Sequence, residues 1–167
     1  MNTQVHFGIT DTSLGLILVA ASGKGICAIL FGEQRAALER ELERRLPGAE
    51  QRRDDARLAQ SLACVKAFVE SPTSGLELPL DPQGTEFQRR VWRALRGIPR
   101  GKTASYAEIA RRIGAPKSFR AVAQACGANP VALAIPCHRV VRNDGALSGY
   151  RWGVARKLAL LEREARA

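Results

Sequence analysis

The stretch Ile135-Pro136-Cys137-His138-Arg139-Val140-Val141 places a thiol beside an imidazole in a largely apolar run. A glycine-rich turn, residues 143–150, follows it. A thiol is a strong nucleophile when deprotonated, and a nearby base or cation lowers its pKa. Because neighbouring side chains point in different directions, an isolated Cys-His pair is first interpreted as a buried cysteine that packs like a small hydrophobic residue. The surrounding sequence decides between the two interpretations.

Several further motifs lie on both sides of this run in a fixed order. They are Gly84-Thr85-Glu86-Phe87-Gln88, Val91-Trp92, Ser105-Tyr106, Arg120-Ala121-Val122, Asn129-Pro130 and Leu147-Ser148-Gly149-Tyr150-Arg151-Trp152-Gly153. With them, residues 79 to about 164 resemble the O6-alkylguanine-DNA alkyltransferase family, the methylated-DNA–protein-cysteine methyltransferases. The similarity is greatest to the C-terminal alkyltransferase domain of the bacterial adaptive-response (Ada) protein, and the first 80 or so residues match more loosely.

The resemblance implies two domains of different fold class. Residues 1–80 are expected to form an α/β N-terminal domain, a small ribonuclease-H-like sheet with helices, together with a connecting segment. Residues 81–167 are expected to form a mainly α C-terminal domain with a helix-turn-helix, which binds DNA and carries out alkyl transfer.

The pattern of residues in the first half agrees with an α/β unit. Short β-rich runs between Ser, Gly and Asp turns predict strands at residues 5–9, 15–20 and 25–31. Apolar stripes at helical spacing predict helices over residues 33–46 and 54–70. A Pro/Gly-containing break follows, and residues 76–80 are expected to form an extended connection.

The second half carries sharper helix signals. Thr85 and Ser105 are each followed three residues later by Gln or Glu, which marks capping-box starts. Glycines and a tight turn separate the expected helices, at about residues 85–97, 105–114, 118–126 and 154–163. The second and third, joined by a short turn with glycine, are typical of a helix-turn-helix.

Charge is divided unevenly along the chain. Residues 1–83 carry 9 Lys/Arg against 11 Asp/Glu, whereas residues 84–167 carry 17 against 5. The second half therefore holds a net charge of +12, and the whole chain +10. A generally arginine-rich protein would not confine the excess to one half, so the distribution favours a phosphate-rich partner such as DNA.

Composition also excludes several classes of protein. No apolar run approaches the length of a membrane span, and the N-terminus lacks the pattern of a signal peptide. Four scattered cysteines and two histidines do not have zinc-site spacing, so no metal and no cofactor are expected. A cytoplasmic, nucleoid-associated monomer with free thiols is the prediction.

The resemblance implies that Cys137 is the alkyl acceptor. It would take a methyl group from O6-methylguanine in double-stranded DNA, and more variably from O4-methylthymine, in one irreversible turnover. His138 is expected to accept the thiol proton through a water molecule, and Glu164 is expected to orient the imidazole. Without the resemblance, Glu164 would be interpreted as a solvated residue of a charged terminal helix.

Three more catalytic assignments come from the same resemblance. Tyr106 is expected to donate a hydrogen bond to the bound guanine, Lys157 to stabilise the thiolate, and Asn129 to tie the recognition helix to the active-site segment. Each residue type has an ordinary alternative: a tyrosine packed in a first helical turn, a surface lysine, and a turn-forming asparagine before Pro130.

The predicted DNA surface centres on Arg120. In the family an arginine of the second helix replaces the target nucleotide in the stack, which offsets part of the few kcal/mol that nucleotide flipping costs. Lys117, Arg111 and Arg112 are expected to contact phosphates, with ordinary surface side chains as the alternative. The remaining DNA-binding assignments are Tyr106, Ser118, Phe119 and Ala121.

A substrate pocket is predicted around the glycine-rich turn. Its expected residues are Tyr150, Trp152, Val140 and Arg151, where relatives can carry a serine in place of the arginine. A bulky indole at the pocket rim is expected to favour methyl over benzyl groups. Phe119 is larger than the residue often found beside the arginine, so the inserted wedge is expected to be larger or the helix to lie differently.

Other functions remain open on the sequence alone. A non-catalytic module that recognises alkylated bases would replace the nucleophile, usually with tryptophan, and Cys137 argues against it. A helix-turn-helix regulator predicts a polar recognition helix, whereas this one is rich in alanine. A Cys-His hydrolase needs an oxyanion hole, for which no motif is found. The sequence also leaves open whether the chain is a stand-alone repair protein or an excised domain of a larger regulator.

Overall fold

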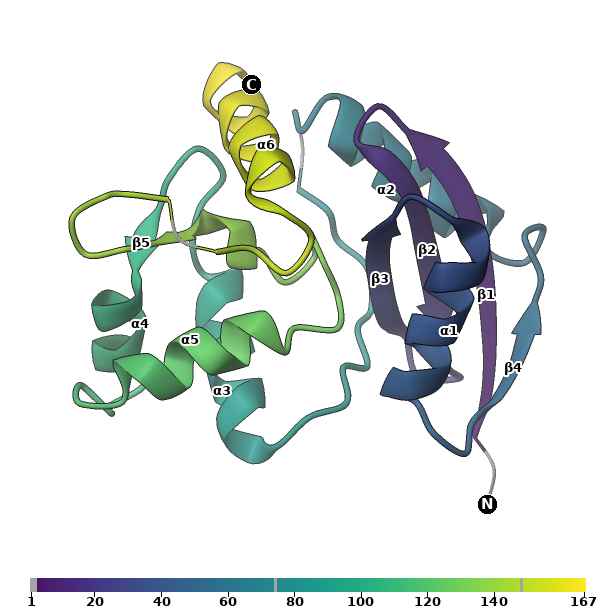
Figure 1. Ribbon diagram of the computed structural model, residues 1–167, viewed down its shortest axis with the longest axis horizontal. Coiled ribbons are helices and arrows are strands. Elements are labelled where there is room, and N and C mark those ends of the chain that lie inside the picture. The colour runs from purple at the N-terminus through teal and green to yellow at the C-terminus, as the bar shows by residue number, and fades with distance from the viewer. Residues whose placement is uncertain (1–2, 74, 148) are drawn as a thin grey trace. The chain divides into compact units, whose positions relative to one another are not determined.

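The computed structural model describes residues 3–73, 75–147 and 149–167. Ser148 of the glycine-rich motif lies outside the described residues. The chain divides into two compact units, one of Met1–Gln83 with Pro130–Ala132 and one of Gly84–Asn129 with Leu133–Ala167 (Figure 1). The first is a small sheet with helices and the second is mainly helical, which confirms the expected fold class. No helix within the described ranges is long and apolar enough to cross a membrane.

The first unit is built on a four-stranded sheet. Its strands are β1 (Gln4–Thr12), β2 (Gly15–Ala21), β3 (Ile26–Gly32) and β4 (Glu50–Arg53), in the order β3-β2-β1-β4. β1, β2 and β3 pair antiparallel, and β4 pairs parallel to β1. Residues 17–20 of β2 are all buried, so both faces of the sheet centre are covered.

Two helices cover opposite faces of this sheet (Figure 1). Helix α1 (Arg35–Arg45) packs Leu38 over Gly32, and helix α2 (Ala59–Glu70) packs Leu62 over Gly8. The pairing register puts these two glycines on different faces. A side chain at either glycine would approach a leucine to within 3 Å, so the small residue sets the helix-to-sheet distance.

Strand β4 was not predicted, and the second helix begins later than expected. The four β4 residues are polar and mostly exposed, so they lack the apolar alternation that marks a strand; parallel pairing with β1 defines it. Asp54 accepts a hydrogen bond from the Arg57 amide, and Asp55 accepts one from the Ile9 amide. These bonds hold the chain in a turn before α2.

Two segments distant in sequence extend the sheet unit beside β3. Ile26 exchanges backbone hydrogen bonds with Pro79 and Asp81, which confirms an extended connection near residues 76–80. The Ile29 amide donates to the Pro130 carbonyl at 3.0 Å, and the Ala132 amide donates to the Ile29 carbonyl at 3.0 Å.

In its described residues the second unit has four α-helices: α3 (Glu86–Arg96), α4 (Tyr106–Arg112), α5 (Phe119–Gly127) and α6 (Val154–Arg166). The Thr85 hydroxyl accepts from the Gln88 amide and the Gln88 side chain accepts from the Thr85 amide, which confirms the capping box. Helices α4 and α5 form the predicted helix-turn-helix. Gly114, with φ +76°, makes the turn between them possible because glycine tolerates positive φ.

A two-stranded sheet that the sequence did not reveal positions the site. β5 (Ala104–Ser105) pairs parallel with β6 (Val140–Val141), which follows a 3₁₀ turn, η1 (Cys137–Arg139). The Ser105 hydroxyl accepts from the Glu108 amide and so caps α4. Each strand has only two residues, too few for a periodic pattern, yet the pairing brings the start of α4 beside the end of the Cys137 segment.

We predict that Gly84→Ala destabilises the second unit by about 1–3 kcal/mol, because overpacking forces buried neighbours to shift. A Cβ at position 84 would lie 2.7 Å from Cζ3 of Trp92, a buried indole whose N–H donates to the Ala125 carbonyl at 2.9 Å. Urea unfolding followed by tryptophan fluorescence measures the change. Gly23→Ala, where a Cβ meets nothing within 4 Å, is the matched control; equal effects at both positions would contradict the packing argument.

Candidate active site

The segment that carries Cys137 is buried along its length. Residues 129–141 are buried, and Cys137 lies in η1 after an irregular stretch in which Leu133 has φ +72°. The Asn129 amide nitrogen donates to the Ile135 carbonyl at 2.8 Å and to Cys137 Sγ at 3.2 Å. One side chain at the end of α5 therefore contacts both the backbone before the thiol and the thiol itself.

The carboxylate of Glu164, in helix α6, binds the side chains of the two residues that follow Cys137. Glu164 Oε2 lies 3.1 Å from His138 Nε2. Arg139 donates from Nε to Glu164 Oε1 at 3.0 Å and from Nη2 to Oε2 at 2.6 Å, and its Nη1 donates to the Ile98 carbonyl at 2.8 Å. Glu164 is only 2% exposed and His138 is fully buried. The result is a buried, charge-assisted network.

Protonation follows from these contacts. Burial raises the pKa of Glu164, but hydrogen bonds from His138 and Arg139 outweigh it and hold the pKa at about 2. Burial lowers the pKa of His138, although Glu164 acts in the opposite direction. His138 is therefore neutral at pH 7, with Nε2–H donating to the carboxylate. Its Nδ1 is buried and has no hydrogen-bond partner among the described residues, so its lone pair can accept a proton.

Lys157 adds a buried ammonium group to the site. Its Nζ donates to the Val140 carbonyl at 2.6 Å, and the side chain is fully buried in α6. Burial lowers the pKa of Lys157, and the neighbouring Cys137 and Cys126 thiols act in the opposite direction. A cation next to a thiol favours the thiolate form. The surface-lysine interpretation of Lys157 is wrong.

A cavity of about 570 Å³ opens beside the thiol. It is lined by Cys137, Tyr106, Tyr150, Arg151, Ala123, Cys126, Gly127, Arg142, Leu147 and Gly149. The Tyr150 hydroxyl is buried without a hydrogen-bond partner in the described part of the chain, and burial raises its pKa well above the usual range. It remains a hydrogen-bond donor for whatever enters.

Two expected pocket residues are not among those lining the cavity. Val140 is buried in β6, where its carbonyl accepts from Lys157. Trp152 is buried and meets the Tyr150 ring edge-on, with centroids 5.4 Å apart. Of these two rings Tyr150 lines the cavity and Trp152 does not, so the indole contacts the cavity wall from behind Tyr150 and not from the rim.

Sequence reasoning missed Arg139 and several of the residues that line the cavity. Arg139 lies in the run of residues 135–141, and its position next to His138 was the one sequence feature that could have predicted its contact with Glu164. Cys126 and Arg142 line the cavity because α5 and the chain after β6 converge there. Nothing in their local sequence marks them.

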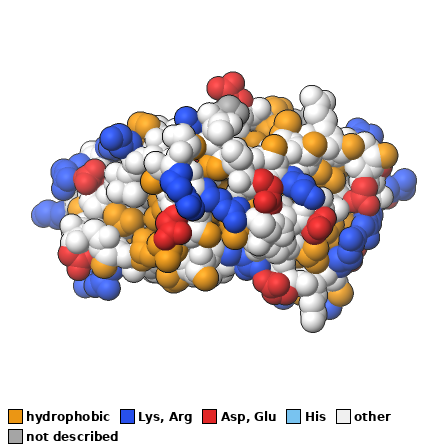
Figure 2. Space-filling model, turned by 90° about the horizontal axis from the view of Figure 1, so that it is seen from above, with side chains coloured by type: hydrophobic (Ala, Val, Ile, Leu, Met, Phe, Trp, Pro, Cys, Tyr) orange, Lys and Arg blue, Asp and Glu red, His pale blue; other side chains and the backbone are white. Residues whose placement is uncertain are grey.

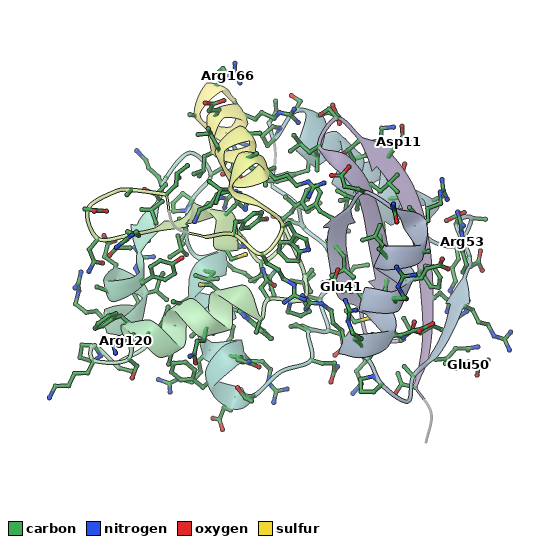
Figure 3. All side chains as sticks on the ribbon, in the orientation of Figure 1. Asp11, Glu41, Glu50, Arg53, Arg120 and Arg166 are labelled. Atoms are coloured by element: carbon green, nitrogen blue, oxygen red, sulfur yellow. The ribbon has the colours of Figure 1, made fainter. Side chains whose placement is uncertain are left out.

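The residues predicted to bind DNA lie on the helix-turn-helix. Arg120 is exposed at the N-terminal end of α5 (Figure 3), and its guanidinium lies 6.0 Å from the centroid of the Phe119 ring. Phe119 is 44% exposed, so its ring is available for a contact from outside the helix-turn-helix. The other members differ in exposure: Lys117, Arg111 and Arg112 are exposed, whereas Ser118, Ala121 and Tyr106 are half-buried.

At least one face of the molecule carries no continuous positive patch. On the face in Figure 2, Lys and Arg side chains are interspersed with Asp and Glu. The described residues include no group of three or more His, Cys, Asp or Glu side chains able to hold a metal ion.

Comparison with known proteins gives matches along the whole chain. The family model "6-O-methylguanine DNA methyltransferase, ribonuclease-like domain" matches residues 5–82, and the corresponding "DNA binding domain" matches residues 86–166. The bifunctional transcriptional activator/DNA repair enzyme Ada of Escherichia coli K12 is 52% identical over 164 residues, 98% of this chain and 46% of Ada. The chain thus spans about half the length of the Ada proteins it matches.

Shorter relatives match over nearly their full length. The methylated-DNA–protein-cysteine methyltransferase of Mycobacterium tuberculosis H37Rv is 39% identical over 161 residues, 96% of this chain and 93% of that protein. The crystal structure of Mycobacterium tuberculosis OGT in complex with DNA superposes with a TM-score of 0.83 at 37% identity, and the match covers 96% of this chain and 93% of that one.

We predict that Glu164→Gln lowers the free energy of unfolding at pH 7 by about 3 kcal/mol, because it breaks a buried ion pair. The low pKa of Glu164 stabilises the fold above about pH 4.5, and this contribution of about 3 kcal/mol is lost as the pH falls towards 2. Denaturant unfolding at several pH values should therefore show a shallower acid loss in the variant.

Glu162→Gln is the matched control, since Glu162 is an exposed residue of the same helix. An acid-unfolding profile of Glu164→Gln that coincides with the wild type would contradict the assignment of the low pKa to this carboxylate.

Proposed function

The chain belongs to the 6-O-methylguanine DNA methyltransferase family, and from that membership we propose that it repairs alkylated DNA by direct reversal. The reaction moves a methyl group from O6-methylguanine, and less readily from O4-methylthymine, onto Cys137. The observation that carries the proposal is the buried thiol at a cavity, backed by a neutral imidazole with a free Nδ1.

The chemistry is a displacement at carbon. The Cys137 thiol loses its proton to His138, whose imidazole is held through Nε2–H by Glu164 and is therefore ready to accept at Nδ1. The sulfur then bonds to the methyl carbon as the carbon–oxygen bond breaks, and the electron pair stays on the guanine. A thioether has no easy route back to a thiol, so each molecule reacts once and needs no cofactor.

Other groups stabilise the two negative charges that develop, one on the Cys137 sulfur and one on the departing guanine. The Lys157 ammonium and the Asn129 amide stabilise the thiolate, since the amide nitrogen lies 3.2 Å from Sγ. Tyr106 and Tyr150 line the cavity and donate hydrogen bonds to the departing base. Arg151, which donates from Nη1 to the Gly127 carbonyl at 3.2 Å, lines the same cavity.

DNA enters this scheme through the helix-turn-helix. Arg120 inserts into the stack in place of the flipped nucleotide, and the exposed Phe119 ring beside it enlarges the wedge. Lys117, Arg111 and Arg112 contact phosphates, and Ser118 and Ala121 lie close to the groove. With DNA as substrate, the protein works at the nucleoid as a monomer.

A methyl group suits the cavity better than a benzyl group in this proposal. Trp152 braces the Tyr150 ring from behind, which limits how far the cavity wall can move. Reaction with O6-benzylguanine as fast as with methylated DNA would contradict this preference.

We predict that excess duplex DNA carrying O6-methylguanine adds one methyl group to the protein, a mass gain of about 14 Da, because a single nucleophile is consumed. Intact-protein mass spectrometry and peptide mapping should locate the adduct on Cys137. Cys137→Ala should gain none, whereas Cys64→Ala, which removes an exposed thiol outside the site, should gain one. Tight binding to the lesion without an adduct would instead indicate a recognition module.

We predict that Arg120→Ala slows methyl transfer from duplex DNA by about 10- to 100-fold, because the flipped state loses the side chain that fills the gap. Reaction with the free base O6-methylguanine should be unchanged, since no flipping is needed. Single-turnover rates with both substrates provide the measurement.

Arg166→Ala removes an exposed arginine at the end of α6 (Figure 3) and serves as the charge-matched control. Equal slowing with duplex and free base would show that Arg120 acts on the chemical step and not on flipping.

A further inference from the structure

Two of the four cysteines line the same cavity. Cys137 comes from η1 and Cys126 from the last turn of α5, and both border the cavity described above. The other two cysteines are elsewhere: Cys27 is buried in β3, and Cys64 is exposed on α2. The proposed methyl transfer uses only one thiol, so it does not account for Cys126.

The surroundings give the two thiols different roles. Cys137 receives the Asn129 N–H and is covalently next to His138, the proposed proton acceptor. Burial, and then the charge of Cys137, raises the pKa of Cys126 far above its usual range, so Cys137 is the thiol that reacts first. The Lys157 ammonium acts electrostatically on both thiols, and both cysteines border the same cavity.

We propose that Cys126 is a resolving thiol that forms a reversible disulfide with Cys137 when the cavity admits a peroxide. This pairing of a reactive thiolate with a second thiol at one cavity is typical of redox-sensitive sites. It goes beyond methyl transfer and requires no DNA.

The chemistry balances in two steps. The Cys137 thiolate attacks one oxygen of hydrogen peroxide, the oxygen–oxygen bond breaks, and hydroxide leaves, so that the sulfur becomes a sulfenic acid. The Cys126 sulfur then attacks that sulfur, the sulfur–oxygen bond breaks, and water leaves with the Cys126 proton. One peroxide is reduced to water and two thiols are oxidised to one disulfide. A dithiol reverses it by exchange.

The disulfide would matter because Cys137 is used only once. A sulfenic acid without a resolving thiol proceeds to sulfinic acid, which is irreversible in most proteins. The disulfide stores the nucleophile in a recoverable form. It also links the end of α5 to η1, so the helix that carries Arg120 is fixed to the active-site segment while the protein is inactive.

Mass spectrometry tests the proposal on the reduced full chain with hydrogen peroxide and no DNA. The wild type should lose two hydrogens, about 2 Da, and a Cys126–Cys137 linked peptide should appear and vanish with dithiothreitol. Cys126→Ser should form no such link and should accumulate Cys137 sulfinic acid at least about fivefold faster. Cys64→Ser is the matched control and should behave as the wild type.

Two results would overturn the proposal. One is Cys137 sulfinic acid forming at the same rate in the wild type and in both Cys126→Ser and Cys126→Ala, with no linked peptide. The other is a link through Cys64 between two molecules. Because the mass change is recorded without DNA, it is independent of whether the chain transfers methyl groups. In a separate assay the oxidised wild type should accept no methyl until it is reduced.

Discussion

The buried carboxylate of Glu164 is the constraint on which the second unit depends. An ionised carboxylate at 2% exposure is unstable unless charged or hydrogen-bonded donors surround it. Here the donors come from two consecutive residues, His138 and Arg139, and Arg139 is itself anchored to the Ile98 carbonyl. Helix α6 must therefore dock on η1, and the 3₁₀ turn must present both side chains in one direction. The alternative is an unpaired charge in the interior.

That requirement also determines the state of the base. Because Arg139 provides the compensating charge, Glu164 stays ionised while His138 stays neutral. In the proposed reaction, an imidazolium at this position could not accept the proton of Cys137. Two functions that one histidine would carry in a simple Cys-His-Glu arrangement are therefore divided between two residues. Arg139 stabilises the buried Glu164 carboxylate, and His138 keeps Nδ1 available to accept a proton.

How much the sequence could predict depended on the kind of signal. The α3 capping box at Thr85 and the glycine after α4 are local signals, so both helix boundaries were predictable, whereas the helix-turn-helix was inferred from helix spacing together with the basic charge. Strand β4 and the pair β5–β6 exist because of partners far along the chain, and neither has an apolar period to reveal it. Cys137, His138 and Glu164 were expected from family resemblance, but the contact from Arg139 and the position of Trp152 behind Tyr150 needed three-dimensional packing.

Helix α5 joins the two tasks that the proposed repair reaction must coordinate. Its first turn exposes Phe119 and Arg120, and its last turn brings Cys126 to the cavity of Cys137. Arg120 and Cys126 are six positions apart in the sequence, which corresponds to about 9 Å along a helix. In the proposed reaction, helix α5 thus connects the side chain that fills the gap in the base stack, Arg120, with the cavity of the reacting sulfur. Asn129 and the Trp92 indole, which bonds to the Ala125 carbonyl, fix the C-terminal end of that element. In the proposed reaction, a nucleotide rotated out of the stack by Arg120 would move towards a site whose position relative to the first turn of α5 is fixed before DNA binds.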